Sequence, residues 1–354
     1  MKKGVLTMIN NSNIIALRLK RQHLIDQISE QEYNQLYKDS SPVQSVYWSG
    51  FGEPPVLSFR TTFDDKEYNR KRQFNRSLVK GRFQGSNLGW IEQEDLELFA
   101  GLARSSIKSH TPLQQEILDL IKLNGPMNIQ QIKEITGQLV KKITPALHKL
   151  QKAFLIYEDQ YNGKWDRAWG LFNEMFPEVN INKFTQLDSL KVVIKRFAYR
   201  NVIFNAAMVK SFYRAKVRNI QDAIRLLVED KELVEYEDMF LLKSDAKLLS
   251  SHTFDLKQSV FIMHRNDFLV KSNEYWLKEK YQHELYDILQ YIFIDGEFGG
   301  AVLGKFKYGP YIIEDVKVDN YYISRKDEII EAIYTVNDRA KSPIKRFLGS
   351  CDGF

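Results

Sequence analysis

Residues 111–172 decide the fold, and they read TPLQQEILDLIKLNGPMNIQQIKEITGQLVKKITPALHKLQKAFLIYEDQYNGKWDRAWGLF. Apolar residues at helical spacing over 113–121 predict a first helix, which should end at the turn residues 124–126. A second, shorter helix is expected between Asn128 and Gly137, because these residue types favour a helix start and a helix end, respectively.

A third helix and a hairpin complete this stretch. Thr144 and Pro145 fit the cap and the first residue of the third helix. The apolar pattern then changes to alternation, so that 154–157 and 165–171 predict two strands joined by a turn at Asn162-Gly163. Three short helices followed by a hairpin are typical of a winged helix, whose third helix commonly enters the major groove of DNA.

The same plan is repeated along the chain. Two helices and a strand pair recur at 189–243, which predicts an α+β fold with tandem winged-helix (helix-turn-helix) domains. Strand-like runs predict a small C-terminal β-sheet before a helix near 325–336; these runs are 260–263, 291–294, 301–306 and 311–318. We divide the 354 residues into four blocks: an N-terminal winged-helix-like domain at 1–105, winged-helix domains at 106–182 and 183–250, and a β-rich subdomain at 251–354.

The first block is predicted to hold three helices, at 14–28, near 30–37 and near 93–104. Ser29 and Glu32 have the spacing of a capping box for the second of them. The turn-rich aromatic stretch 39–63 reads as a long surface loop; such loops are often functional, although a purely structural loop fits the same pattern.

Basic residues are clustered although the net charge is only +6. The charged residues of 66–82 are basic except Glu67, and those of 191–218 are all basic. This clustering fits a face turned toward a polyanion, although a charged run can also be an ordinary solvated helix face. With the outward residues of the third helix, these runs give the candidate DNA-binding residues: Arg70, Lys71, Arg72, Arg76, Lys80, Arg82, Lys141, Lys142, Lys149, Lys195, Arg196, Arg200, Lys210 and Arg214. We expect them to line one concave channel for double-stranded DNA.

Several other classes of protein find no support in the sequence. Cys351 is the single cysteine, so no internal disulfide forms, which fits a reducing compartment. No secretory signal is evident, and no apolar run approaches the roughly 20 residues that cross a bilayer, so we expect a cytoplasmic protein without membrane contact. The six histidines lack ligand spacing, so neither a metal nor a cofactor is expected. The glycines match no dinucleotide-binding pattern, and no nucleophile elbow occurs.

A series of short landmarks occurs in a consistent order along nearly the whole chain. They are the helix 16–24 (ALRLKRQHL), the segment 43–46 (VQSV), the stretch 85–96 ending in QEDL, the segment 163–167 (GKWDR) leading to Phe176-Pro177, and the stretches 261–269 and 294–304. In this order they resemble the AlkZ/YcaQ type of tandem winged-helix DNA glycosylase, the family that releases alkylated or crosslinked bases.

The resemblance implies one catalytic candidate. The family carries a Gln-x-Gln or Gln-x-Asp signature where this chain has Gln44 and Val46. An alkylated base already carries positive charge, so the site must shield an oxocarbenium-like sugar and hold a water, which an amide or a carboxylate can do. Val46 can do neither, and the family's Thr-x-His element is absent at 86–89. Glu53 and His23 are the candidate substitutes for the missing second group.

Three functions remain open from the sequence. The leading interpretation is a duplex DNA-binding protein of the AlkZ/YcaQ-like superfamily that recognises alkylated or crosslinked DNA and has partly lost its catalytic motif. The first alternative is an active DNA glycosylase that uses Gln44 with a substitute partner. The second is a transcriptional regulator built on winged-helix domains. Winged helices also form protein–protein contacts. The sequence does not indicate which protein would be a partner.

Overall fold

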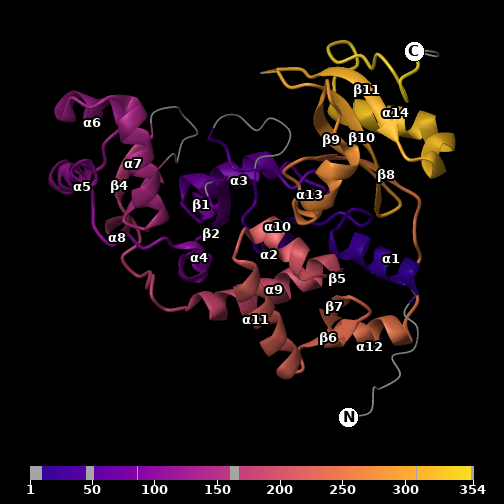
Figure 1. The fold of residues 1–354 in the computed structure, drawn as a ribbon, viewed down its shortest axis with the longest axis horizontal. Helices are drawn as coiled ribbons and strands as arrows, with labels where there is room; N and C mark the ends of the chain where they lie inside the picture. The colour runs from indigo at the N-terminus through magenta and orange to yellow at the C-terminus, as the bar shows by residue number, and fades with distance from the viewer. Residues whose placement is uncertain (1–9, 45–51, 86, 160–166, 308, 352–354) are drawn as a thin grey trace. The chain divides into compact units, whose positions relative to one another are not determined.

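The structure of the chain is a computed structural model, which describes residues 10–44, 52–85, 87–159, 167–307 and 309–351 (Figure 1). The chain divides into two compact units, and we describe each by itself. The sheet unit comprises Met1–Gln27, Ala198–Phe212 and Asp230–Phe354, and the hairpin unit comprises Ile28–Phe197 and Tyr213–Glu229.

The hairpin unit alternates short helices with two-stranded hairpins. In chain order its elements are α2 (Glu30–Asp39), α3 (Asp65–Phe74), β1 (Leu78–Gln84), β2 (Asn87–Glu92), η1 (Gln93–Asp95), α4 (Leu96–Ala103), α5 (Pro112–Asn124), α6 (Ile129–Thr136), α7 (Val140–Lys152), β3 (Ile156–Asp159), β4 (Ala168–Leu171), α8 (Phe172–Met175), the first part of α9 (Gln186–Asn201) and α11 (Val217–Glu229). The strands β1 and β2 pair antiparallel, as do β3 and β4.

The first two helices of the stretch 111–172 begin and end as the sequence predicts. Thr111 caps α5 by accepting a hydrogen bond from the backbone of Gln114, whose side chain returns the bond. Asn128 caps α6 in the same way, and Gly137 ends α6 in the left-handed conformation with φ 65°. Glycine suits this position because it adopts a positive φ without a steric penalty.

The start of the third helix is a correction to the sequence prediction. The helix α7 begins at Val140, so Pro145 lies inside it and Thr144 is not its cap. The buried stripe explains the earlier start, because Ile143 and Leu147 are both fully buried and lie on either side of Pro145. Burial of this stripe stabilises the first turn more than the proline destabilises it.

The helices α5, α6 and α7 pack around one apolar core. Its buried members include Ile117, Ile132, Leu147, Leu150 and Trp169, so every helix and the hairpin β3–β4 contribute to it. The predicted three-helix and hairpin order of this stretch is therefore observed, although the predicted turn at Asn162-Gly163 lies outside the described residues.

One local arrangement occurs three times. Before each hairpin, a short extended segment pairs antiparallel with the second strand of that hairpin, and each time the partner residue is aromatic. The three pairs are Val43 with Trp90, Met127 with Trp169, and Phe204 with Phe240. A helix then follows each hairpin directly or after a 3₁₀ turn. The three copies thus share one local backbone arrangement, and their assignment to tandem winged-helix domains remains a prediction.

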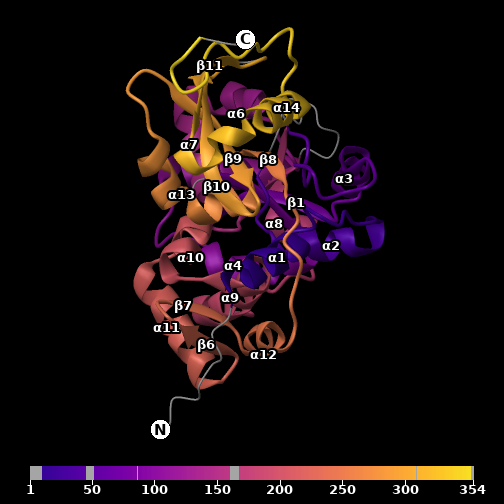
Figure 2. The ribbon, with the colours of Figure 1, turned by 90° about the vertical axis from the view of Figure 1, so that its right-hand side faces the viewer.

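The sheet unit is built on a four-stranded antiparallel sheet (Figure 2). Its elements are α1 (Asn11–Arg21), β5 (Ile203–Phe204), most of α10 (Ala206–Tyr213), β6 (Leu233–Tyr236), β7 (Met239–Leu242), α12 (Lys243–Ser251), β8 (Val260–His264), α13 (Phe268–Tyr281), β9 (Asp287–Ile294), β10 (Glu297–Lys305), β11 (Ile312–Val318), η2 (Asn320–Arg325) and α14 (Lys326–Val336). The four predicted strand runs fall on β8 to β11, and the strand order β11-β10-β9-β8 is a simple meander.

The core of this sheet lies against α14. Ile329 and Ile333 of α14 are fully buried in one cluster with Ile262, Ile292 and Val302 of three strands. The smaller sheet β5-β7-β6 packs against α1, where Ile14 and Leu17 are buried with Leu241 and Leu249.

Several N-terminal predictions differ from the structure. The helix α1 covers Asn11–Arg21 rather than 14–28, and Asn10 caps it. Ser29 precedes α2 but its side chain makes no capping hydrogen bond, so the predicted capping box is wrong. The helices α3 and α13 were not predicted, because α3 is strongly polar and α13 mixes apolar and charged residues without a clear apolar face.

The mixture of helices with small antiparallel sheets confirms an α+β fold. The boundaries of the four sequence blocks remain a prediction, because the two compact units draw on segments from more than one block. Among the described residues, no helix is both long enough and apolar enough to cross a membrane.

Candidate nucleic-acid interface

The helix α7 separates an apolar face from a basic face. Ile143 and Leu147 are buried, whereas Lys141, Lys142 and Lys149 are exposed. None of these three lysines forms an ion pair with any residue that the structure describes. Their ammonium charges are therefore available to a ligand.

The basic residues of 66–82 fall into two groups. Lys71 and Arg70 are exposed on α3, although Arg70 bonds to Glu53. Arg72 and Lys80 are buried and paired with carboxylates. A buried, paired cation offers little charge to a phosphate, so we leave Arg72 and Lys80 out of the proposed interface.

Arg72 has a structural role that its neighbours make clear. It bonds to Glu92 on β2, and its guanidinium carbon lies 5.3 Å from the ring centre of Tyr37 and 5.4 Å from that of Tyr68. Cation–π contacts of this kind stabilise a buried arginine. The residue thus joins α3 to α2 and β2.

A buried charge cluster joins β1 to the hairpin β3–β4. Nζ of Lys80 lies 2.7 Å from Oε1 of Glu158, and Nη1 of Arg167 lies 3.0 Å from the same oxygen. Although burial raises the pKa of Glu158, Lys80 and Arg167 outweigh it and hold that pKa below its usual value. Arg76 adds a second link, because its Nη2 lies 2.7 Å from Oδ2 of Asp159.

Arg82 brings the 66–82 stretch next to α7. Its Nη2 lies 2.7 Å from Nε2 of His148. Burial and the charge of Arg82 lower the pKa of His148, so the imidazole is neutral at pH 7 and accepts this bond. Two of the three stretches predicted to line a DNA channel therefore lie in contact within the hairpin unit.

The third predicted stretch, 191–218, contributes less exposed charge than its sequence indicates. Arg196 pairs with Asp95 through two bonds of 2.5 and 3.0 Å, and Arg200 is buried and donates to the backbone oxygen of Arg21. Lys195 is half-buried, whereas Lys210 and Arg214 are exposed. Arg200 is left out of the proposed interface because it is only 3% exposed.

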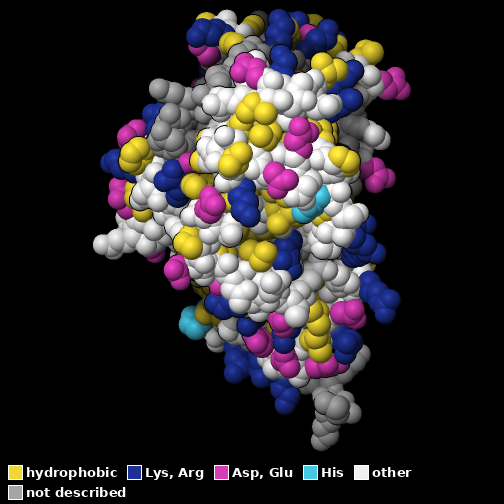
Figure 3. Space-filling view, turned by 90° about the vertical axis from the view of Figure 1, so that its left-hand side faces the viewer, with side chains coloured by type: hydrophobic (Ala, Val, Ile, Leu, Met, Phe, Trp, Pro, Cys, Tyr) yellow, Lys and Arg dark blue, Asp and Glu magenta, His cyan; other side chains and the backbone are white. Residues whose placement is uncertain are grey.

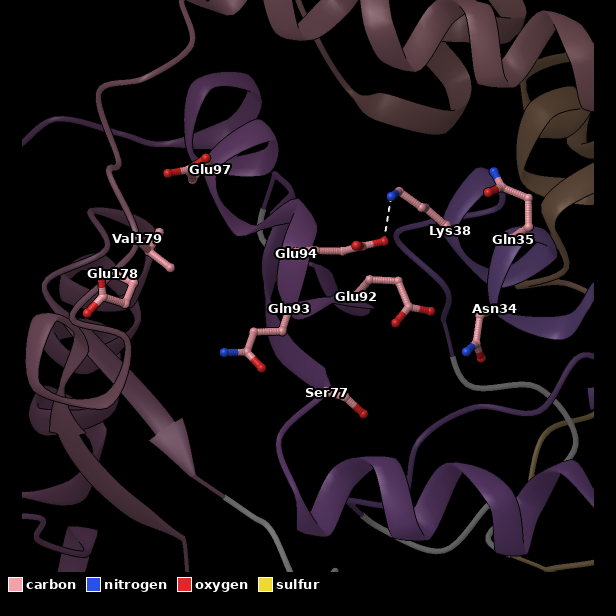
Figure 4. Close-up of a pocket in the computed structure, with 10 residues that line it drawn as sticks. All are labelled: Asn34, Gln35, Lys38, Ser77, Glu92, Gln93, Glu94, Glu97, Glu178 and Val179. Atoms are coloured by element: carbon pink, nitrogen blue, oxygen red, sulfur yellow. Dashed lines mark hydrogen bonds and ion pairs between the residues drawn. The ribbon is translucent and has the colours of Figure 1, made fainter. Parts of the chain in front are cut away.

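The hairpin unit also contains an acidic pocket (Figure 4). The exposed lysines of α7 are not among its lining residues. Its volume is about 660 Å³, and its lining residues are Asn34, Gln35, Lys38, Ser77, Glu92, Gln93, Glu94, Glu97, Glu178 and Val179. Figure 4 shows Lys38 paired with Glu94 across one side of the pocket. Lys38 is the one basic residue of this lining, and it already pairs with Glu94, so the lining offers no unpaired cation to a phosphate and we leave the pocket out of the proposed interface.

On the face drawn in Figure 3, the basic side chains do not form a continuous surface. On this face, Lys and Arg side chains stand among Asp, Glu and apolar side chains. A phosphate backbone would thus meet local groups of cations such as the lysines of α7, rather than a uniformly basic face.

Gln44, the catalytic candidate, is buried beside a second glutamine. It follows Val43, whose backbone exchanges two hydrogen bonds of 2.9 Å with Trp90 of β2. Nε2 of Gln44 donates to Oε1 of Gln84 at the end of β1. Gln44 is 8% exposed and Gln84 is 2% exposed.

The other residues named for this site do not join the pair. Val46 lies outside the described residues, and His23 lies in the sheet unit. Glu53 bonds to Arg70, and its Oε2 lies 3.2 Å from Nζ of Lys66. Gln84 was not predicted, because a glutamine beside Gly85 reads only as part of a hairpin turn.

Comparison with known proteins identifies a solved structure with a similar fold. No family model matches the chain, and no curated protein sequence matches it. Among solved structures, the Streptomyces sahachiroi DNA glycosylase AlkZ superposes with a TM-score of 0.68 over 95% of this chain and 97% of that chain, at 13% sequence identity.

The chain has the AlkZ fold. The likeness covers both compact units, so the resemblance predicted from the order of short landmarks is confirmed at the level of the fold. At 13% identity, AlkZ supplies the architecture, and the chemistry has to be argued from the residues of this chain.

Proposed function

We propose that this chain binds duplex DNA and recognises alkylated or crosslinked lesions in it. The observation that carries the proposal is the basic face of α7, where Lys141, Lys142 and Lys149 are exposed and unpaired among the described residues. The AlkZ fold supports it, because that fold is found in a DNA glycosylase.

The proposal treats the α5–α7 stretch as a winged helix. Here α7 is the third helix of a three-helix unit that ends in the hairpin β3–β4, and the third helix of such units commonly enters the major groove. The repeated arrangement around Val43, Met127 and Phe204 supports tandem domains of this type. Lys71 of α3 and Lys210 of α10 are the other exposed predicted residues without a described ion pair.

Preference for damaged DNA has a physical basis. Extruding a base from a duplex costs a few kcal/mol, and this cost is lower where damage has weakened stacking or pairing. A protein that holds an extruded nucleotide near Gln44 would therefore bind a damaged duplex more tightly than an intact one.

The test is an affinity titration by fluorescence anisotropy. Two duplexes of the same sequence are compared, one intact and one with a single N7-methylguanine. We expect binding to both and tighter binding to the damaged duplex. No binding to either duplex would contradict the proposal. Strong preference for one intact sequence over all others would instead favour a transcriptional regulator.

A second candidate function is excision of the damaged base. The specific observation in its favour is the bond between the buried amides of Gln44 and Gln84, since an amide can hold a water and shield a cationic sugar. Free base released from the N7-methylguanine duplex would identify this activity.

A further inference from the structure

The amide pair of Gln44 and Gln84 contains one buried donor, Nε2 of Gln84, that lacks a described hydrogen-bond partner. Their mutual bond uses Nε2 of Gln44 and Oε1 of Gln84, so Oε1 of Gln44 and Nε2 of Gln84 remain. Nε2 of Gln84 is buried and has no hydrogen-bond partner among the residues that the structure describes. A buried donor without a partner costs about 1–3 kcal/mol. A ligand that accepts a hydrogen bond from this group would remove the cost.

The position of Gln44 within the repeated arrangement supports a role outside folding. In the other two copies, the residue that follows the paired segment is an asparagine. Asn128 caps α6, and Oδ1 of Asn205 accepts a bond of 3.0 Å from the backbone of Met208 in α10. Gln44 occupies the corresponding place, yet its side chain bonds across to Gln84. The first copy thus replaces a helix cap by an amide pair.

The backbone holds both amides firmly. Val43 is fixed to Trp90 by its two backbone bonds, and Pro42 packs on Gly89, where an added Cβ would lie 2.8 Å from Cβ of Pro42. Gln84 ends β1, just before Gly85 turns the chain with φ 64°. Each glutamine therefore sits on a paired backbone segment, which favours precise orientation.

We propose that Gln84 is the second amide of a base-excision site, where its buried Nε2 donates to the departing base while Gln44 holds the water. The inference rests on the proposed function, and it names the substrate as a deoxynucleotide whose base carries a positive charge from N-alkylation. Glu53 is not the substitute, because Arg70 and Lys66 already hold its carboxylate.

The reaction is a hydrolysis that needs no other reagent. The bond between C1′ and the base nitrogen breaks, and its electron pair moves to the base, which becomes neutral. The oxygen of a water adds to C1′, and the proton that this water loses passes to bulk solvent. Oε1 of Gln44 accepts a hydrogen bond from the water, and Nε2 of Gln84 donates to an acceptor on the departing base, where electron density increases.

The experiment measures release of free N7-methylguanine under single-turnover conditions with the full chain. Wild type is compared with Gln84→Ala and Gln84→Glu. The Gln84→Glu variant keeps an acceptor for Nε2 of Gln44 but lacks the donor. We expect both variants to release the base about 100-fold more slowly, the loss typical of one such donor. Affinity for the damaged duplex should change less than twofold.

Gln151 provides a matched control. It lies on α7 in the same unit, is 6% exposed, and its amide likewise has no partner among the described residues. Gln151→Ala should release the base at the wild-type rate. Wild-type rates in both Gln84 variants would overturn the inference. Tight binding without base release by wild type would overturn it too, while leaving the proposed function intact. Failure to bind DNA would overturn the proposed function itself.

Discussion

Lys80 and Glu158 occupy corresponding positions in two copies of the repeated arrangement, and their side chains form a buried ion pair. Lys80 lies opposite Trp90 in the first hairpin, and Glu158 lies opposite Trp169 in the second. Nζ of Lys80 is 2.7 Å from Oε1 of Glu158, and the two side chains are 5% and 1% exposed. The two copies are thus joined through equivalent places by opposite charges.

This pair predicts a large loss of stability when one partner is removed. Lys80→Met leaves the buried Glu158 with Arg167, and with Arg82 as a further charge nearby, so the free energy of unfolding should fall by about 3 kcal/mol. Chemical denaturation of the purified protein measures this change.

The double variant separates pairing from packing. Lys80→Met combined with Glu158→Gln should cost much less than the sum of the two single changes, because the double variant leaves no uncompensated carboxylate. Additive losses would show that the two charges act independently and would contradict the pairing.

The contact of α4 with α9 and with the segment before it leaves no room for a side chain at Gly101. A Cβ at this position would overlap Oγ of Ser189 and lie 2.8 Å from the backbone oxygen of Phe184. Gly101→Ala should therefore lower the free energy of unfolding by about 2 kcal/mol. Gly170→Ala is the control, because its nearest atom would be 3.5 Å away. Equal melting temperatures for the two variants would refute the close approach.

His264 predicts a pH dependence in the sheet unit. Burial, and then the charge of Arg265, lower the pKa of His264 to about 4. Between that value and the ordinary value near 6.5, the unfolded chain binds a proton that the folded chain does not, so acid destabilises the fold. The contribution of the neutral His264 to the free energy of unfolding is complete above pH 6.5. About 3 kcal/mol of it is lost as the pH falls from 6.5 through 4.

A variant isolates this effect from other titrating groups. Nδ1 of His264 accepts a bond of 3.1 Å from the backbone of Asn266, and the side-chain oxygen of an asparagine can accept the same bond. His264→Asn should therefore flatten the pH dependence of unfolding between pH 4 and 6.5. An unchanged slope in urea denaturation across this range would mean that His264 does not titrate as described.

Local signals in the sequence were sufficient for most of the backbone. Asn128 and Gly137 mark the two ends of α6, and a strand-like run over 311–318 marks β11, because caps and strand-like runs are signals that act within a few residues. Pro145 misled the prediction of α7, since the burial of Ile143 is decided by contacts with distant helices.

The candidate site was harder to predict than the fold. Clustered charge in the sequence gave no means to tell the exposed Lys141 from the buried Lys80, whose partner Glu158 lies 78 residues further along the chain. The pairing of Gln44 with Gln84 likewise spans 40 residues, and neither residue carries a local signal for it. Such partners can be identified only once the three-dimensional arrangement of the strands is known.

The most direct test of DNA binding is the slope of log Kd against log salt concentration for an intact duplex. Neutralising Lys141, Lys142 and Lys149 together to glutamine should weaken binding and reduce that slope by about 2.7, because each lost phosphate contact removes about 0.9. Glutamine at Lys305, Lys307 and Lys317 of the sheet unit makes the same change in net charge and should leave the slope unaltered. Equal slopes for wild type and the α7 variant would contradict the account.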